Sequence, residues 1–413
     1  AQYLVPLIEP DSQYNPLRNG STLYDNAVVR LKEITDHTNR SMLNMTVGAT
    51  VKLPANIKYR TKVNYYLFDR QRFKYSPSTL PSRTDEMGGY ALRQSYGEQS
   101  IYFEQIVDYS LKKGNHKFDA TLGQTYKHFI SNKLQLEGEG YVVDDMKWND
   151  MGAVANKDSY YADTEQILKN KIAIFARANY NYKNRYYFTL TGRLDGASNF
   201  AANHKWGFFP SGAFKWVISN EPWLKAEWLD DLSIKLSLGQ SGNDLNQAYR
   251  SMARLDAGSG GYPFNGSLSQ QFWQARIASP NLTWETNTLG NIAIDAAFFN
   301  NRLSVTAEVY RSVTTDLLLT VKTPQHTGYD NKYENIGRTT SQGVEFSLNS
   351  RNIVKRGFTW STSFTISHSS SIVNNLGQEA QVVSKAAPTG GYMTVGYKPG
   401  YPVNAFWGFQ YAG

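Results

Sequence analysis

Alternation of apolar and polar residues is the feature that most restricts the fold of this chain. In "NKIAIFARANYNYKNRYYFTLTGRLDG", which begins at Asn170, apolar residues occupy every second position on both sides of a turn at 183–185. Successive side chains of a β-strand point to opposite faces of a sheet, so this period predicts two antiparallel strands with one apolar and one polar face. The fold class then depends on whether the apolar face contacts lipid or a protein interior.

The same period recurs along the chain and predicts about a dozen strands, most of them near the length of a tilted membrane-spanning strand. Short turns and long polar loops alternate between these strands. Outer-membrane barrels have this asymmetry, with short periplasmic turns and long extracellular loops. The sequence therefore predicts an all-β protein, an antiparallel transmembrane β-barrel. The expected short turns are 54–56, 113–115, 183–185, 300–301 and 353–357, with a medium connection after Ile218, and the expected long loops are roughly 76–97, 137–166, 196–206, 241–283, 318–341 and 372 onward.

Composition agrees with many half-exposed strands. The chain has 28 Tyr, 20 Phe and 9 Trp but only 41% hydrophobic residues, and it has no Cys. No apolar run approaches the roughly 20 residues of a spanning helix, which does not exclude a membrane, because barrels cross without such runs. The net charge of +8 suggests nucleic acid. However, the basic residues are dispersed and no nucleic-acid-binding motif is present, so no nucleic-acid partner is predicted.

The two parities of the strands predict three sets of residues. Apolar positions are expected to face lipid, and aromatic residues beside the turns are expected to form a girdle where hydrocarbon meets headgroups, although aromatic residues are also common in strands generally. Charged positions are expected to line the lumen, since Arg or Lys facing lipid at mid-membrane costs roughly 2–4 kcal/mol. The lipid-facing set is Ile172, Ile174, Ala176, Leu190, Leu236, Ile294 and Val305; the girdle is Tyr180, Tyr182, Tyr186 and Phe298; the lumen set is Arg60, Lys62, Arg177, Arg193, Asp195, Lys235, Asp295 and Glu308.

No residue pattern indicates an enzyme. The six histidines lack metal-ligand spacing, and adjacent acids such as Asp144–Asp145 point apart in an extended chain. No nucleophile elbow or phosphate-binding glycine loop is present. The sequence therefore predicts no catalytic, cofactor or metal site. Short helices are expected only in "AVVRLKEI" and "NEPWLKAEW".

Aromatic residues in the long loops are the remaining candidates for contact with a substrate or a partner, because their faces stack on sugar rings and on peptide side chains. The alternative is that they pack the loops against each other. The candidates are Trp148, Trp273, Tyr329 and Trp407.

Several segments resemble a known family. "RYYFTLTGRLDGASNF", "KWGFFPSGAFKWVISNEPWL" and "LSIKLSLGQSGN" are similar to successive blocks of the SusC/RagA family of TonB-dependent outer-membrane transporters of Bacteroidetes. "PNLTWETNTLGNIAIDAAFFNNRLSVTAEVYRSVTTDLLL", "NIGRTTSQGVEFSLNSRNI" and "GYKPGYPVNAFWGFQYAG" resemble later blocks. The resemblance extends from about Lys171 to the end. The earlier part fits by its strand pattern and by "NPLRNG".

The resemblance implies a bacterial outer-membrane protein that imports a nutrient, an oligosaccharide or a peptide, with energy from TonB and a SusD-like surface lipoprotein as partner. Residues 1–413 are expected to form part of a single barrel domain, with the plug domain, the TonB-contacting segment and the terminal strands outside this chain. Two alternatives remain at this stage. One is a soluble β-rich carbohydrate-binding or adhesin-like protein, and the other is an outer-membrane barrel with a structural or secretion role.

Overall fold

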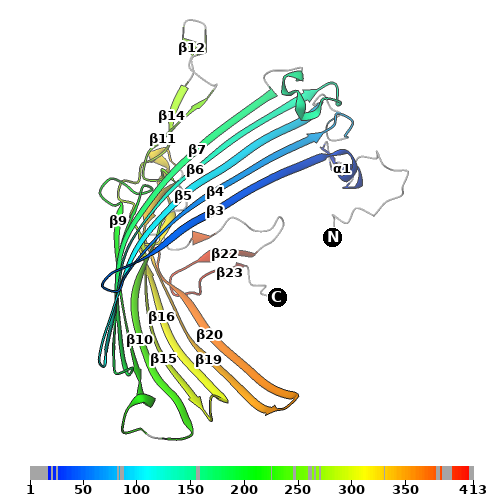
Figure 1. The fold of residues 1–413 in the computed structure, drawn as a ribbon. Helices are drawn as coiled ribbons and strands as arrows, with labels where there is room; N and C mark the ends of the chain where they lie inside the picture. The colour runs from blue at the N-terminus through cyan, green and yellow to red at the C-terminus, as the bar shows by residue number, and fades with distance from the viewer. Residues whose placement is uncertain are drawn as a thin grey trace. The chain divides into compact units, whose positions relative to one another are not determined.

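A large antiparallel sheet dominates the structure, which is a computed structural model (Figure 1). Its twelve strands follow the order of the sequence, so each long strand pairs with the long strand before it and the one after it. This confirms the predicted all-β class and strand number. The structure describes residues 17–19, 22–24, 27–80, 83, 88–154, 159–224, 226–244, 248–258, 263–264, 267–268, 271–329, 331–377, 382–383 and 393–408.

The strands of the large sheet are longest in the first half of the chain. The sheet consists of β3 (Thr35–Leu53), β4 (Ile57–Ser76), β5 (Gly89–Lys113), β6 (His116–Tyr141), β7 (Tyr160–Tyr182), β8 (Tyr186–Ala197), β9 (Trp206–Val217), β10 (Leu229–Asn243), β15 (Glu285–Phe298), β16 (Leu303–Thr315), β19 (Arg338–Lys355) and β20 (Phe358–Asn375).

The short turns follow from residues that tolerate positive φ. Lys183 and Asn184 have φ of 52° and 54°, and Asn300 and Asn301 have φ of 57° and 56°. Two consecutive residues with positive φ form the tight hairpin turns whose twist matches that of antiparallel strands, and Asn adopts this conformation readily. The turns at 54–56, 183–185 and 300–301 are confirmed. The turn expected at 353–357 is shorter, because pairing continues to Lys355 opposite Phe358.

Strands also extend into regions expected to be loops. β5 begins at Gly89, β6 continues to Tyr141 and β7 begins at Tyr160. Residues 89–97, 137–141 and 160–166 are therefore strand. Ladder hydrogen bonds join backbone groups, so a strand can continue after its apolar alternation has ended. The polar composition of these residues predicted loops, and it therefore placed the ends of β5, β6 and β7 at the wrong positions.

The remaining elements are short. The helix expected in "AVVRLKEI" is α1 (Ala27–Glu33). In contrast, "NEPWLKAEW" contains no α-helix in its described residues, and its first residue is the last one of the short 3-10 turn η5 (Ile218–Asn220). Over the described ranges, no helix is long and apolar enough to span a membrane. The others are β1 (Leu17–Asn19), β2 (Thr22–Tyr24), η2 (Lys147–Asn149), η3 (Met151–Ala153), β11 (Arg254–Gly258), β12 (Pro263–Phe264), β13 (Ser267–Leu268), β14 (Gln271–Arg276), β17 (Leu318–Lys322), η6 (Gln325–Thr327), β18 (Asn331–Asn335), β21 (Val382–Val383), β22 (Met393–Tyr397) and β23 (Ala405–Gly408).

The chain divides into two compact units, each with a small core. Unit 1 comprises residues 1–47, 63–102 and 127–169, and its core contains Tyr75, Ala91, Tyr141 and Val154. Unit 2 comprises residues 48–62, 103–126 and 170–413. Its core contains Ala197, Phe200, Phe209, Leu282 and Trp284, where β8, β9 and β15 meet their long connections.

Candidate functional site on the polar face of the sheet

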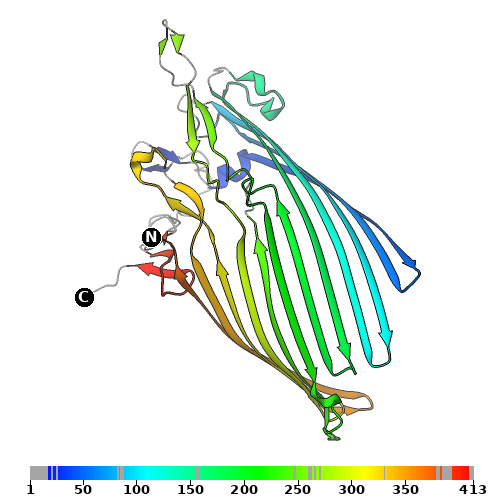
Figure 2. The same cartoon turned by 90° about the vertical axis from the view of Figure 1, so that its left-hand side faces the viewer.

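The strand register of unit 2 separates the side chains into two faces. The strands β8, β9, β10, β15 and β16 lie side by side in the sheet (Figure 2). Leu190 pairs with Gly212, Leu236 pairs with Ile292, and Ile294 pairs with Ala307, so residues of apolar parity share one face. No second layer covers this face within the described part of unit 2: Leu190 is 67% exposed and Ile294 is 46% exposed. The register places all seven expected lipid-facing residues here, and their contact with lipid stays a prediction.

The centre of the polar face contains hydrogen-bonded charges from three strands. Lys235 on β10 forms an ion pair with Asp295 on β15, and Thr306 on β16 donates to Asp295 at 3.1 Å. Cross-strand neighbours lie close enough for such pairs because their Cβ atoms are about 5 Å apart. Together with β8 and β9, these strands line a hollow of about 270 Å³ whose wall includes Lys235, Asp295 and Glu308.

A second polar chain runs beside this pair. Ser237 donates to the Asn291 side-chain oxygen, and the Asn291 amide donates to Glu308 at 2.7 Å. Glu308 in turn pairs in register with Glu345 on β19. The arrangement holds a carboxylate among amide and hydroxyl groups, which suits a hydrated surface.

Two arginines of the predicted lumen set lie on β7 and β8. Arg193 makes a bidentate contact with Asp195, at 2.7 and 2.8 Å, and its guanidinium lies 5.7 Å from the centre of the Phe175 ring. Arg177 donates to the Thr191 hydroxyl at 3.2 Å. Bidentate pairs fix the plane of an Arg side chain, so Arg193 is held along the face.

The remaining lumen candidates form pairs between β4 and β5. Arg60 lies 2.8 Å from Asp108, and Lys62 lies 3.4 Å from Glu104. These side chains are partly exposed, and exposed pairs stabilise by only about 0–1 kcal/mol each. The polar face thus carries both signs of charge in pairs. Within the described residues no three His, Asp or Glu side chains are grouped to hold a metal.

Two of the expected girdle tyrosines, Tyr182 and Tyr186, cluster with Trp216 beside the β7–β8 turn. Tyr186 stacks with Tyr182 at 6.5 Å and with Trp216 at 6.3 Å. The Tyr186 hydroxyl and the Trp216 Nε1–H both donate to Glu221, at 2.5 and 3.0 Å. These hydrogen bonds hold the pKa of Glu221 below its usual value. The rings of Tyr186 and Trp216 lie on the apolar face, while their O–H and N–H groups make hydrogen bonds to Glu221 in the connection after β9.

The other girdle candidates have similar partners. Tyr180 shares a 2.7 Å hydrogen bond with His116 Nδ1, and Phe298 stacks on Trp228 at 5.8 Å. Tyr180 and Phe298 lie near short turns, and Trp228 lies at the end of the connection between β9 and β10. Their placement at a hydrocarbon–headgroup boundary stays a prediction.

The four loop aromatics differ in exposure. The ring centre of Trp148 lies 5.8 Å from that of Phe73, and the ring centre of Trp407 lies 4.9 Å from that of Tyr401. Both tryptophans therefore pack against aromatic residues of this chain. Tyr329 is partly buried. Trp273 on β14 is 46% exposed and is the most accessible candidate of the four.

Sequence reasoning missed the aromatic rings on the polar face. A Cβ at Gly123 or Gly242 would collide with Phe175 or Phe209 respectively, because each ring lies across the neighbouring strand. Tyr310 similarly covers Gly343. In each of these three cases, an aromatic residue on the polar face therefore lies against a glycine of the neighbouring strand. That signal is present in the sequence, but it can be read only once the register is known.

Comparisons with known proteins agree with this architecture. The family described as "TonB dependent receptor-like, beta-barrel" matches residues 7–412. TonB-dependent receptor P3 of Formosa agariphila is 28% identical over 398 residues, which cover 94% of this chain and 39% of that protein. TonB-dependent receptor SusC of Bacteroides thetaiotaomicron is also 28% identical, over 97% of this chain and 39% of that protein. The chain thus spans about two-fifths of each of these two relatives.

Among solved structures, that of the RagAB peptide transporter superposes with a TM-score of 0.83 at 19% identity. The match covers 94% of this chain and 42% of that chain. At this identity the likeness concerns the fold.

Proposed function

Because the chain belongs to the TonB-dependent receptor family of outer-membrane β-barrels, in its SusC/RagA branch, we propose that it is part of the wall of a transporter that imports a nutrient across the bacterial outer membrane. The cargo is an oligosaccharide or a peptide. TonB supplies energy through a segment outside this chain, and a SusD-like lipoprotein is the surface partner. Residues 1–413 then belong to one barrel domain.

The observation that carries this proposal is the difference between the two faces of unit 2. Apolar residues such as Leu190 and Leu238 are more than half exposed, at 67% and 62%. In a water-soluble sandwich the same residues would be covered by a second sheet. Exposure of a continuous apolar face is favourable where the solvent is hydrocarbon.

The polar face supports a lumen role. Several of its charges form ion pairs across strands, as in Lys235–Asp295 and Arg60–Asp108, and both signs are represented. A wall of this kind stays hydrated without attracting only anions or only cations. Selectivity then resides in the loops and in parts of the transporter outside this chain, with Trp273 as the accessible loop aromatic.

The face assignment is testable because the chain has no Cys. Thr191→Cys and Leu190→Cys are introduced separately into full-length protein that contains no other cysteines. Each variant is then labelled in intact outer membranes with a water-soluble maleimide. We expect labelling at 191 and protection at 190 until detergent is added. Equal labelling at both positions would support the soluble alternative and overturn the proposal.

Uptake tests the activity. The gene for the full-length protein is deleted, and entry of fluorescent oligosaccharides and of fluorescent peptides is measured with and without the restored gene. We expect one class to depend on the gene and on a functional TonB. Uptake of both classes that is unchanged by the deletion would favour the structural or secretion role instead.

The SusD-like partner is tested by purifying the transporter from its own membranes in mild detergent. We expect a lipoprotein to co-purify, and its deletion to reduce uptake of the same cargo class. A transporter that purifies alone and retains full uptake without the lipoprotein would remove this partner from the proposal.

A further inference from the structure

Arg311 is an exception on the apolar face. It lies on β16 opposite Gly290 on one side and Gln342 on the other, in the row that continues to Leu238 and Ser370. From the row of Leu303 to the row of Val313, every other apolar-face residue of β10, β15, β16, β19 and β20 is uncharged. A charge facing hydrocarbon is costly unless it is compensated.

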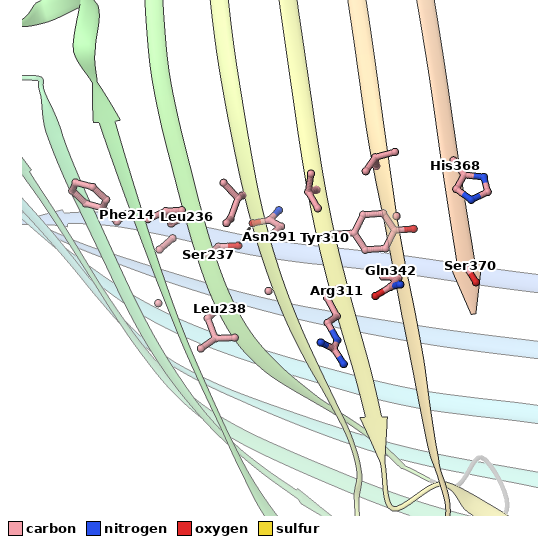
Figure 3. A pocket seen from close by; sticks show the side chains of 17 residues that line it. Phe214, Leu236, Ser237, Leu238, Asn291, Tyr310, Arg311, Gln342, His368 and Ser370 are labelled. Carbon is pink, nitrogen blue, oxygen red and sulfur yellow. Dashed lines mark hydrogen bonds between the residues drawn. The ribbon is translucent and has the colours of Figure 1, made fainter. Parts of the chain in front are cut away.

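An apolar groove adjoins this arginine. Its volume is about 930 Å³, and its lining includes Phe214, Leu236, Leu238, Ile292 and Val344. Figure 3 shows Leu238 of β10 on one side of the groove, and Arg311, Gln342 and Ser370 contributed by the successive strands β16, β19 and β20. The cavity is therefore elongated along the row, with polar groups at one side.

Two strand glycines leave the groove open. A Cβ on Gly212 would come no closer than 3.5 Å to Leu190, and one on Gly290 would come no closer than 3.5 Å to Leu238. Neither glycine is needed to avoid a collision, although glycine weakens a strand interior. Glycine in a strand interior often marks a place where another group approaches the backbone closely, and these two positions leave the groove unfilled.

The polar side of the groove has unused hydrogen-bonding groups. The side chains of Arg311, Gln342, His368 and Ser370 make no hydrogen bond or ion pair with any other residue in the described part of the chain. Arg311, Gln342 and Ser370 lie in one row on β16, β19 and β20, and His368 lies in the next row. Guanidinium, amide and hydroxyl groups together match an oxyanion with several acceptor oxygens.

We propose that this groove binds a phosphate-bearing membrane lipid, with an acyl chain along Leu238, Ile292 and Val344 and the phosphate on Arg311. The inference rests on the proposed lipid contact of the apolar face. The single cation and the absence of acidic residues in these rows complement an anionic headgroup. The apolar lining continues into the rest of the face, as an acyl chain requires.

The test uses full-length transporter purified in detergent, stripped of lipid and analysed by native mass spectrometry with diphosphorylated lipid A or with the same lipid after phosphate removal. We expect the phosphorylated lipid to bind about tenfold more tightly, and Arg311→Gln to remove about that factor. Arg302→Gln, at the other end of β16, is the matched control and leaves binding unchanged.

Gly290→Leu tests the groove independently of the charge. A Cβ at this position clears Leu238 at 3.5 Å and the rest of the leucine side chain extends into the groove, so we expect weaker lipid binding with Arg311 intact. Inorganic phosphate alone should not compete, since it lacks the acyl chain.

Three results would overturn the inference: equal affinity for both lipids, an equal effect of Arg302→Gln, or a second copy of the chain on this face in place of lipid. If Leu190→Cys is labelled from water, the face assignment fails as well. If position 190 is protected and lipid binding is independent of phosphate, only this inference fails.

Discussion

The two faces of the same strands carry different kinds of side chain. On β15, Asn291 joins a chain of polar side chains on one face, while its neighbour Ile292 is 55% exposed on the other. The polar face carries charges of both signs, several of them in ion pairs, whereas the apolar face, over the rows described above, carries Arg311 as its single charge. Both faces share one backbone and one set of ladder hydrogen bonds. The difference therefore lies in the medium that each face meets.

The largest expected effect comes from two adjacent aromatic residues on opposite faces. Phe209 is 6% exposed and packs on Trp284 with ring centres 5.6 Å apart, whereas Phe208 is 61% exposed. We expect Phe209→Ala to lower the free energy of unfolding by about 3–5 kcal/mol and Phe208→Ala to lower it much less. Urea unfolding of the full-length barrel in lipid vesicles measures both. Equal losses would mean that Phe209 does not belong to a core.

The second prediction places the same charge on each face of β15. Ile292→Lys is expected to cost roughly 2–4 kcal/mol near the membrane centre, while Asn291→Lys gains Glu308 as a partner and costs little. Assembly is measured as the fraction of full-length protein that is folded in the outer membrane. This fraction is obtained from the gel mobility of unheated samples. A larger defect for Asn291→Lys would reverse the two faces.

The third prediction concerns an ion pair of the polar face. Asp295→Asn leaves Lys235 without its partner, and we expect a loss of about 1 kcal/mol, because both groups are partly exposed. Glu345→Gln is the matched control. Glu345 has no ion pair among the described residues and lies opposite Glu308, so its neutralisation should be harmless or slightly stabilising. The same unfolding assay applies.

The smallest effect concerns Asp144, a carboxylate in the connection after β6. Burial raises its pKa, but hydrogen bonds from the Ser78 N–H at 3.0 Å and the Tyr75 hydroxyl at 2.7 Å outweigh burial, and the pKa lies below its usual 3.8. A depressed pKa stabilises the folded state above the unfolded value. This contribution is therefore present above about pH 3.8 and is lost as the pH falls through the folded pKa.

Pepsin cleavage of the full-length protein measures this change. We expect Asp144→Asn to be cleaved faster than wild type near the top of the acidic range and at the same rate at the lowest pH. A difference between the two proteins that is constant with pH would exclude titration of Asp144 as its cause.

Much of the fold could be predicted because it depends on local periodicity. The alternation from Ile172 to Tyr182 and the turn at Lys183–Asn184 each specify their own hairpin, and both are present. Strand ends could not be predicted, because β5 and β7 continue on backbone pairing where the apolar pattern stops. The helix expected in "NEPWLKAEW" was wrong, since this connection folds so that Glu221 accepts hydrogen bonds from Tyr186 and Trp216.

The candidate site divides in the same way. Parity assigned Lys235, Asp295 and Glu308 to one face, but it could not identify Lys235 and Asp295 as partners, because that contact requires the register between β10 and β15.

By itself, the sequence determined a sheet of two-faced strands with short turns, because alternation and turn chemistry act between residues close in the chain. The tertiary structure decided which distant residues meet: Phe209 against Gly242, Glu221 at the polar edges of two rings, and Arg311 opposite Gly290. These contacts join residues far apart in sequence. Each depends on a register that hydrogen bonds along whole strands fix together.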